Sequence, residues 1–254
     1  MSKEIPKIYM TGVKKNKVPK NTGMPSFDEA LKDEIGIEEK LPSKVDLRNK
    51  FPEVYSQTLG CCTTCAALAC DDYYYHNTKK WKPSLVFTYH MQKVVDKEPM
   101  IDDGSTVWTA LRAIKKYGVC NAKVWPEDEP LEKNPSKAAL ADGLKGHEIK
   151  KNYEIEKLSQ VKKALYRGYP VPCSFTWTDA MMNVGSDYIL PEPTEREVDK
   201  CDTGHAVCVV GYDNKKELLI IRNSWGSDWG DNGYCYMTYD TFKLCMFEAY
   251  AVTK

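Results

Sequence analysis

The chain has 254 residues, and its 36 lysines and arginines balance 36 aspartates and glutamates, so the formal net charge is zero. This balance gives no electrostatic reason to expect nucleic acid or an anionic membrane as a partner. No apolar run approaches the length of a membrane span, and the N-terminus lacks the apolar core of a secretion signal. The length suits one large domain or two closely packed lobes.

The N-terminal segment, residues 1–41, differs in composition from the rest and is rich in lysine and turn residues. Ser26 followed by Glu29 predicts the cap of a short helix. The segment is either a flexible tail or a cover that packs on the body and regulates it. The second interpretation draws on its apolar residues, which a solvated tail would not need: Ile8, Tyr9, Met10, Met24, Phe27 and Leu31.

Residues 42–254 form the body, and its first half is predicted to be mainly helical. An extended run over 42–48 precedes helices over 63–76, 85–96 and 107–117, the last ended by Gly118. The second half begins with an amphipathic helix over 155–166 and a strand over 171–176. Residues 179–201 lack periodicity, and strands follow over 205–212, 218–222 and 233–238. This order predicts an α+β protein, with two lobes and a cleft between them.

A cysteine pair stands where a polar turn meets the first helix of the body. The sequence runs Gln57-Thr-Leu-Gly60-Cys61-Cys62-Thr-Thr-Cys65, followed by alanines that favour helix. Backbone N–H groups at a helix N-terminus favour negative charge, and the thiolate is the nucleophilic form of cysteine. The stretch therefore predicts an activated thiol at the start of a helix. Buried cysteines are also commonly inert, so the stretch alone does not decide.

The other half of the chain supplies partners for such a thiol. His205 follows Gly204 at the start of an apolar strand, where its ring is expected to be exposed at a lobe edge. Each of the other three histidines, His76, His90 and His147, is expected to be structural or solvated. Asn223 leads a glycine- and tryptophan-rich run, and its carbonyl can hold an imidazole N–H while Trp225 excludes water.

These motifs resemble the three signatures of the papain family of cysteine peptidases. The likeness rests on Gly60-Cys61-Cys62, Gly204-His205-Ala206 and Asn223-Ser-Trp225-Gly, and it extends from about Pro42 to the C-terminus. Within the family, the segments around Gly104-Ser-Thr and Trp125-Pro resemble a microbial and viral branch. The resemblance implies a two-lobed fold, with a helical left lobe, an antiparallel β-barrel right lobe and a catalytic cleft between them.

The resemblance also implies site roles and partners. Cys62 would be the nucleophile, His205 the acid and base, Asn223 the orienting group and Gln57 an oxyanion donor, acting on polypeptide substrates through an acyl-enzyme. No metal or other cofactor is expected. Cys61 stands where serine is usual, Thr63 where papain has tryptophan, and the spacing from Gln57 to Cys62 is one residue shorter than usual. Relatives commonly carry an inhibitory leader, which implies that residues 1–41 restrain the enzyme.

Specificity and location are further expectations of the resemblance. The segment around Glu248, near the C-terminus, resembles the strand that floors the second substrate subsite. The best match puts Glu248 or a neighbour there, so arginine is expected to be accepted. An exposed or salt-bridged glutamate is the alternative. With no secretion signal and ten cysteines expected to be reduced, the expected location is the cytoplasm or a virion.

Two other functions remain open from the sequence. One is a papain-like scaffold that binds a partner without catalysis. The other is a zinc or redox module built on Cys62-x-x-Cys65, which has the spacing of a metal or thioredoxin-like motif. No second cysteine pair follows to complete a zinc site.

Overall fold

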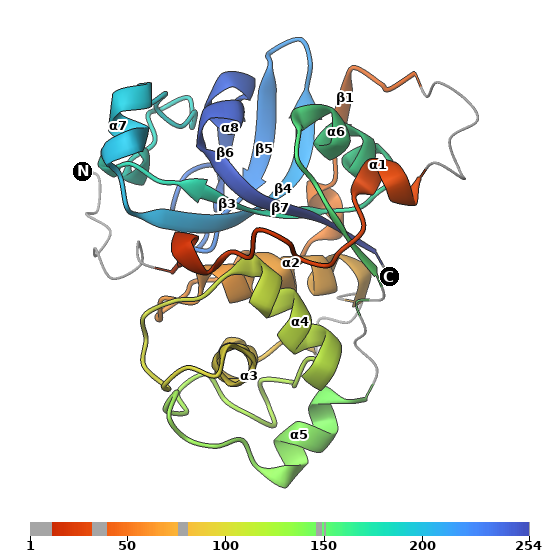
Figure 1. The fold of residues 1–254 in the computed structure, drawn as a ribbon, viewed down its shortest axis with the longest axis vertical. Helices are drawn as coiled ribbons and strands as arrows, with labels where there is room; N and C mark the ends of the chain where they lie inside the picture. Colours follow the sequence, from red (N-terminus) through yellow and green to blue (C-terminus); the bar gives the residue numbers. More distant parts are fainter. Residues whose placement is uncertain (1–11, 32–39, 76–80, 146–148, 150, 254) are drawn as a thin grey trace.

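The computed structural model describes residues 12–31, 40–75, 81–145, 149 and 151–253. It has two lobes with a long helix, α2, between them (Figure 1). The lower lobe is helical, and the upper lobe contains the sheet. No helix in the described residues is long and apolar enough to cross a bilayer.

The helical lobe is built around α2 (Cys62–Tyr75), which packs against α3 (Leu85–Asp96), α4 (Val107–Tyr117) and the sheet. Its first eleven residues are all buried, and several are alanines or cysteines whose small side chains allow close approach on every side. Gly118 ends α4 with a φ of +69°, a conformation that favours glycine. A shorter helix, α5 (Lys137–Gly143), closes the lobe at the bottom.

The sheet is antiparallel, and its strands run in the order β2-β7-β3-β4-β5-β6, with β1 paired to the end of β4. No pairing joins β2 to β6 in the part of the chain that the structure describes, so the sheet is open. The β-barrel that the resemblance implied is thus not closed in the described residues, and the predicted α+β class is confirmed. The strands are β1 (Lys44–Asp46), β2 (Lys151–Glu154), β3 (Val171–Thr176), β4 (Gly204–Asp213), β5 (Leu218–Arg222), β6 (Tyr234–Thr238) and β7 (Met246–Thr253).

Most predicted elements are present within a few residues of their predicted bounds. Those not predicted are short or lack a clear period: α5, β2, α8 (Tyr239–Cys245) and two short helices within 179–201. One of these two is α7 (Glu195–Lys200), capped by Thr194 and Glu197. The predicted helix over 155–166 is α6 (Leu158–Tyr166), and Ser26 does precede α1 (Phe27–Ala30), without a side-chain capping bond.

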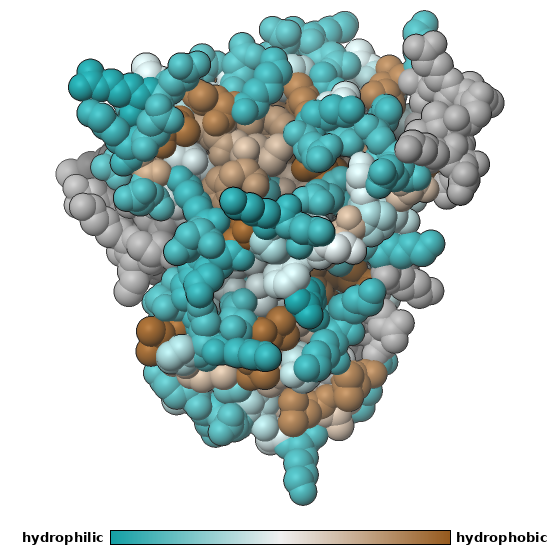
Figure 2. Space-filling model, viewed as in Figure 1, coloured by the Kyte–Doolittle hydropathy of each residue, from teal (hydrophilic) through white to brown (hydrophobic). Residues whose placement is uncertain are grey.

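The N-terminal segment crosses the molecule between the two lobes (Figure 1). The described part, residues 12–31, begins beside α2, passes α4 and reaches α1, near β2 and α6. Phe27 is fully buried and packs edge-on against Tyr153, and Asp28 forms an ion pair with Lys157. Figure 2 shows mainly hydrophilic side chains across the middle of this face. Of the apolar residues predicted to anchor the segment, Ile8, Tyr9 and Met10 lie outside the described residues.

Candidate active site

Cys62 is the first residue of α2 and lies where that helix meets the sheet. The backbone N–H groups of Thr63 and Ala206 lie close enough to its sulfur to lower the pKa of the thiol. Because Ala206 directly follows His205 on β4, this contact brings the thiol next to the predicted base. The structure thus brings together two residues separated by more than half of the chain.

His205 and Asn223 are joined by a hydrogen bond of 2.8 Å between Nε2 and Oδ1. The backbone N–H of Ser224 also donates to Asn223 Oδ1 at 2.8 Å, which identifies this atom as the oxygen. His205 Nε2 must therefore carry the proton and donate it. The other ring nitrogen, Nδ1, is buried and has no hydrogen-bond partner among the described residues.

Two tryptophans enclose the imidazole. Trp225 stacks on His205 with ring centroids 4.6 Å apart, and Trp177 meets the ring edge-on at 4.8 Å. His205 is therefore buried, whereas the sequence predicted an exposed ring. Trp177, which follows β3 directly, was not predicted from the sequence as part of the site. Its position after a strand is a weak signal, because the pairing of β3 with β4 brings it to His205.

Gln57 lies in the loop before α2 and is held against the segment that carries Asn223. Its backbone N–H donates to Ser224 O at 3.0 Å, and its side-chain oxygen accepts from the Ser224 hydroxyl. Its amide nitrogen donates to Leu59 O at 2.8 Å, which uses one of its two hydrogens. The shortened loop thus still places Gln57 beside the two motifs.

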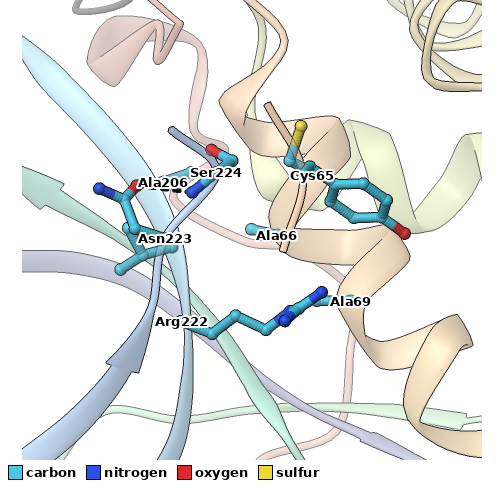
Figure 3. Close-up of a pocket in the computed structure, with 9 residues that line it drawn as sticks. Cys65, Ala66, Ala69, Ala206, Arg222, Asn223 and Ser224 are labelled. Atoms are coloured by element: carbon cyan, nitrogen blue, oxygen red, sulfur yellow. Dashed lines mark hydrogen bonds between the residues drawn. The ribbon is translucent and has the colours of Figure 1, made fainter. Parts of the chain in front are cut away.

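A small cavity of about 10 Å³ lies behind Asn223, between α2 and the sheet. Figure 3 shows Cys65, Ala66 and Ala69 of α2 on one side. Arg222 and Asn223 come from the other side, and the Arg222 side chain reaches toward the helix. The cavity is only about large enough for one water, so this face of the site is closely packed.

Burial sets the protonation of both candidate catalytic groups. It raises the pKa of the Cys62 thiol to about 12, although the N–H groups of Ala206 and Thr63 act in the opposite direction. It lowers the pKa of His205 to about 4, and the bond to Asn223 offsets only part of that effect. In this state both groups are neutral near pH 7. The thiol at the helix terminus is therefore not activated here, because burial outweighs the helix dipole.

The N-terminal segment covers the thiol. A Cβ built on Gly12 would overlap the Cys62 sulfur and would lie 2.9 Å from Gly60 O. The next residue, Val13, packs against Gly204, and the segment pairs with Ser105 through two backbone hydrogen bonds of 2.9 and 3.1 Å. Neither Gly12 nor Ser105 was singled out by the sequence analysis, because neither carries reactive chemistry.

Glu248 does not lie in an open subsite. It is buried, and its carboxylate accepts from the backbone N–H groups of Val107 and Trp108, at 3.2 and 2.7 Å, and from Ser174 Oγ at 2.7 Å. It thereby caps the N-terminus of α4 from strand β7. Its neighbour Phe247 packs against Gly204 instead, because side chains alternate along a strand. This placement does not match the predicted arginine site.

The remaining histidines and cysteines stand apart from this arrangement. His90 is buried, with its Nδ1 2.7 Å from Leu131 O, while His76 and His147 lie outside the described residues. All ten cysteines are free, and Cys65 lies one turn deeper in α2 than Cys61, with their sulfurs 4.0 Å apart. Within the described residues, no three His, Cys, Asp or Glu side chains group as metal ligands would.

Comparison with known proteins identifies the family. The sequence-family model described as papain family cysteine protease matches residues 41–254 of this chain. An uncharacterized peptidase C1-like protein of Acanthamoeba polyphaga mimivirus is 32% identical over 212 residues, covering 77% of this chain and 67% of that protein. Papain of Carica papaya is 26% identical over 224 residues, covering 82% of this chain but only 57% of its own length.

Solved structures agree with the family match. Xylellain, a cysteine protease from Xylella fastidiosa, superposes with a TM-score of 0.75 at 26% identity, covering 86% of this chain and 90% of its own. Digestive procathepsin L 3 of Tenebrio molitor superposes with a TM-score of 0.70 at 18% identity, covering 98% of this chain and 77% of its own. This chain belongs to the papain family of cysteine proteases, which confirms the predicted family and its class of hydrolases.

Proposed function

We propose that this chain is a cysteine endopeptidase in which Cys62 is the nucleophile, His205 the acid and base, and Asn223 the orienting group. The hydrogen bond between His205 Nε2 and Asn223 Oδ1 is the observation that carries this proposal. It fixes the imidazole tautomer that leaves Nδ1 able to accept a proton, on the residue next to Ala206, whose N–H contacts the Cys62 sulfur.

The reaction then follows from these positions. His205 Nδ1 takes the thiol proton, and the thiolate attacks the carbonyl carbon of the peptide bond. The oxyanion accepts hydrogen bonds from the Cys62 N–H and the Gln57 amide. The imidazolium gives its proton to the leaving amine, and Cys62 remains acylated. Water, deprotonated by His205, attacks the thioester and restores the thiol. Trp225 keeps solvent from the His205–Asn223 bond throughout.

We further propose that residues 1–41 act as a covering leader of this enzyme. The described part of the leader passes over Cys62, uses both backbone groups of Ser105 and is held at its far end by Phe27. The Gly12 carbonyl at the thiol accepts from the Ser105 N–H, so this carbonyl is already paired in the covered form. Solved proteins of the same fold include forms named as precursors, such as procathepsin L 3.

The test compares peptide turnover by two full-length proteins, Gly12→Val and Gly12→Val/Cys62→Ala. Valine at position 12 overlaps the Cys62 sulfur, so it should displace the leader from the cleft. We expect turnover from the first protein and at least a thousandfold less from the second, as is usual when a nucleophile is removed. Equal turnover by the two would assign the activity to another group and overturn the proposal. Location in the cytoplasm or a virion stays a prediction.

A further inference from the structure

A lysine side chain of the leader is bound at the edge of the cleft. Lys14 Nζ lies 2.6 Å from a Glu98 carboxylate oxygen and 2.9 Å from an oxygen of Asp103. The Lys14 side chain is only 18% exposed, and Glu98 is 84 residues away in sequence. The hydrogen bonds to both carboxylates outweigh the effect of burial and raise the pKa of Lys14, so the bound group is an ammonium ion.

The backbone of the leader places this lysine relative to the thiol. Ser105 N donates to Gly12 O, and Lys14 N donates to Ser105 O, so Val13 is the residue opposite Ser105. Side chains alternate along an extended chain. Val13 therefore points toward Gly204, and Lys14 points the other way, toward Glu98 and Asp103.

The carboxylates outnumber the cations that the body of the protein supplies. Lys93 is fully buried and contacts Glu98 at 3.2 Å and Asp103 at 2.5 Å. One ammonium thus faces two carboxylates, and the leader adds Lys14 together with Lys17, which is 3.3 Å from Glu98. When the leader leaves the cleft, Glu98 and Asp103 lose the positive charges of Lys14 and Lys17.

Building on the proposed function, we propose that Glu98 and Asp103 form a substrate subsite that binds a lysine or arginine side chain. A substrate that pairs with Ser105 in the direction opposite to the leader puts one residue over Cys62, the residue before it opposite Ser105 and the residue before that in the place of Lys14. The subsite would therefore select a basic residue at the third position on the N-terminal side of the scissile bond. The leader is held by the same subsite and so imitates a preferred substrate.

The first experiment measures the subsite within the intact chain, without catalysis. Full-length Lys14→Arg, Lys14→Leu and Lys14→Glu proteins are compared by the rate of Cys62 alkylation. We expect Arg to stay near the wild-type rate, Leu to react about fivefold faster and Glu faster still, which is typical of a partly exposed ion pair. Lys20→Leu, an exposed leader position, is the control. Equal rates for Arg, Leu and Glu would overturn the proposal.

The second experiment measures substrate choice in full-length Gly12→Val. Two peptide substrates differ only in lysine or leucine at the third residue before the cut. We expect about a five- to tenfold preference for lysine in kcat/KM. Glu98→Gln should reduce this preference, while Asp240→Asn, which removes an exposed charge on α8, should leave it unchanged. Glu98→Gln keeps Asp103 as a partner for buried Lys93, so the fold should survive.

The outcomes separate this inference from the proposed function. Turnover of both peptides at equal rates would reject the subsite and leave the peptidase standing. Absence of turnover would reject the peptidase, and binding of the same two peptides to Gly12→Val/Cys62→Ser would then decide the subsite. Tighter binding of the lysine peptide supports it, and equal binding overturns it.

Discussion

Gly12 lies directly over Cys62, so closely that no side chain larger than hydrogen fits between the leader and the sulfur. This contact accounts for the burial of the thiol and, through burial, for its raised pKa. It also leaves no room for another group at the Cys62 sulfur while the leader is in place.

The first prediction concerns this contact. Gly12→Ala should speed alkylation of Cys62 at pH 7 by at least tenfold, because the added methyl group forces the leader away from the sulfur. Gly185→Ala is the matched control, since it makes the same change at an exposed glycine where the added Cβ would meet only the Asp187 side chain, at 3.3 Å. An unchanged rate for Gly12→Ala would show that the leader does not limit access to the thiol.

The second prediction concerns pH. A pKa of His205 lowered to about 4 means that a form in which the imidazole is exposed to water, with a pKa near 6.5, binds the proton first. Acid between about pH 6.5 and 4 should therefore favour uncovering. A Cys62 pKa raised from 9.0 to about 12 favours uncovering as pH rises above 9. The covered form should be most stable between these limits.

Limited proteolysis of the leader across pH 4 to 11, followed by mass spectrometry, checks this profile. Cleavage should be slowest between about pH 6.5 and 9 and faster on both sides. Pepsin is used at acid pH and trypsin at neutral and basic pH. Because the activity of each protease itself depends on pH, each rate of leader cleavage is divided by the rate at which the same protease cuts an unstructured peptide. Cleavage that rises steadily from acid to base would contradict the assignment to His205.

The third prediction concerns the orienting group. Asn223→Ala in full-length Gly12→Val should lower kcat roughly 10- to 100-fold, because His205 loses the acceptor that fixes its tautomer. KM should change little, since Asn223 is buried behind the imidazole. Asn232→Ala, at an exposed turn, is the control. A normal kcat with a raised KM would place Asn223 in substrate binding instead.

The fourth prediction concerns Glu248. Because its carboxylate caps α4 from β7, Glu248→Ala should lower stability by about 2 kcal/mol and Tm by roughly 4–8 °C. In the Gly12→Val background, the ratio of arginine to leucine cleavage at the second residue before the cut should not change. A changed ratio with an unchanged Tm would restore the arginine site that the sequence predicted.

The sequence predicted the parts of the fold that have a clear local signal. The helices over α2, α3 and α4 follow from periodicity and caps, and Gly118 ends α4 as expected. The sequence did not predict that the sheet is open. Whether a sheet closes into a barrel depends on which strands pair at its two edges and not on the pattern of any one strand.

In the candidate site, too, the residues with a local sequence signal could be predicted and those without one could not. Cys62, His205 and Asn223 could be predicted from the sequence because their residue types carry chemistry and stand in recognisable motifs. Gly12, Ser105 and Ala206 act through backbone atoms and close approach, so nothing in their side chains indicates them. Glu248 is buried and its neighbour Phe247 packs against Gly204, so the arginine subsite predicted for Glu248 or a neighbour stays a prediction.

The central claim is that Cys62 is the nucleophile under a leader that keeps it closed. Its most direct test is to treat full-length wild type and Gly12→Val with a peptidyl epoxide and to map the adduct by tandem mass spectrometry. The account predicts an adduct on Cys62 alone, formed much faster in Gly12→Val. An adduct on Cys61 or Cys65, or equal labelling of both proteins, would contradict it.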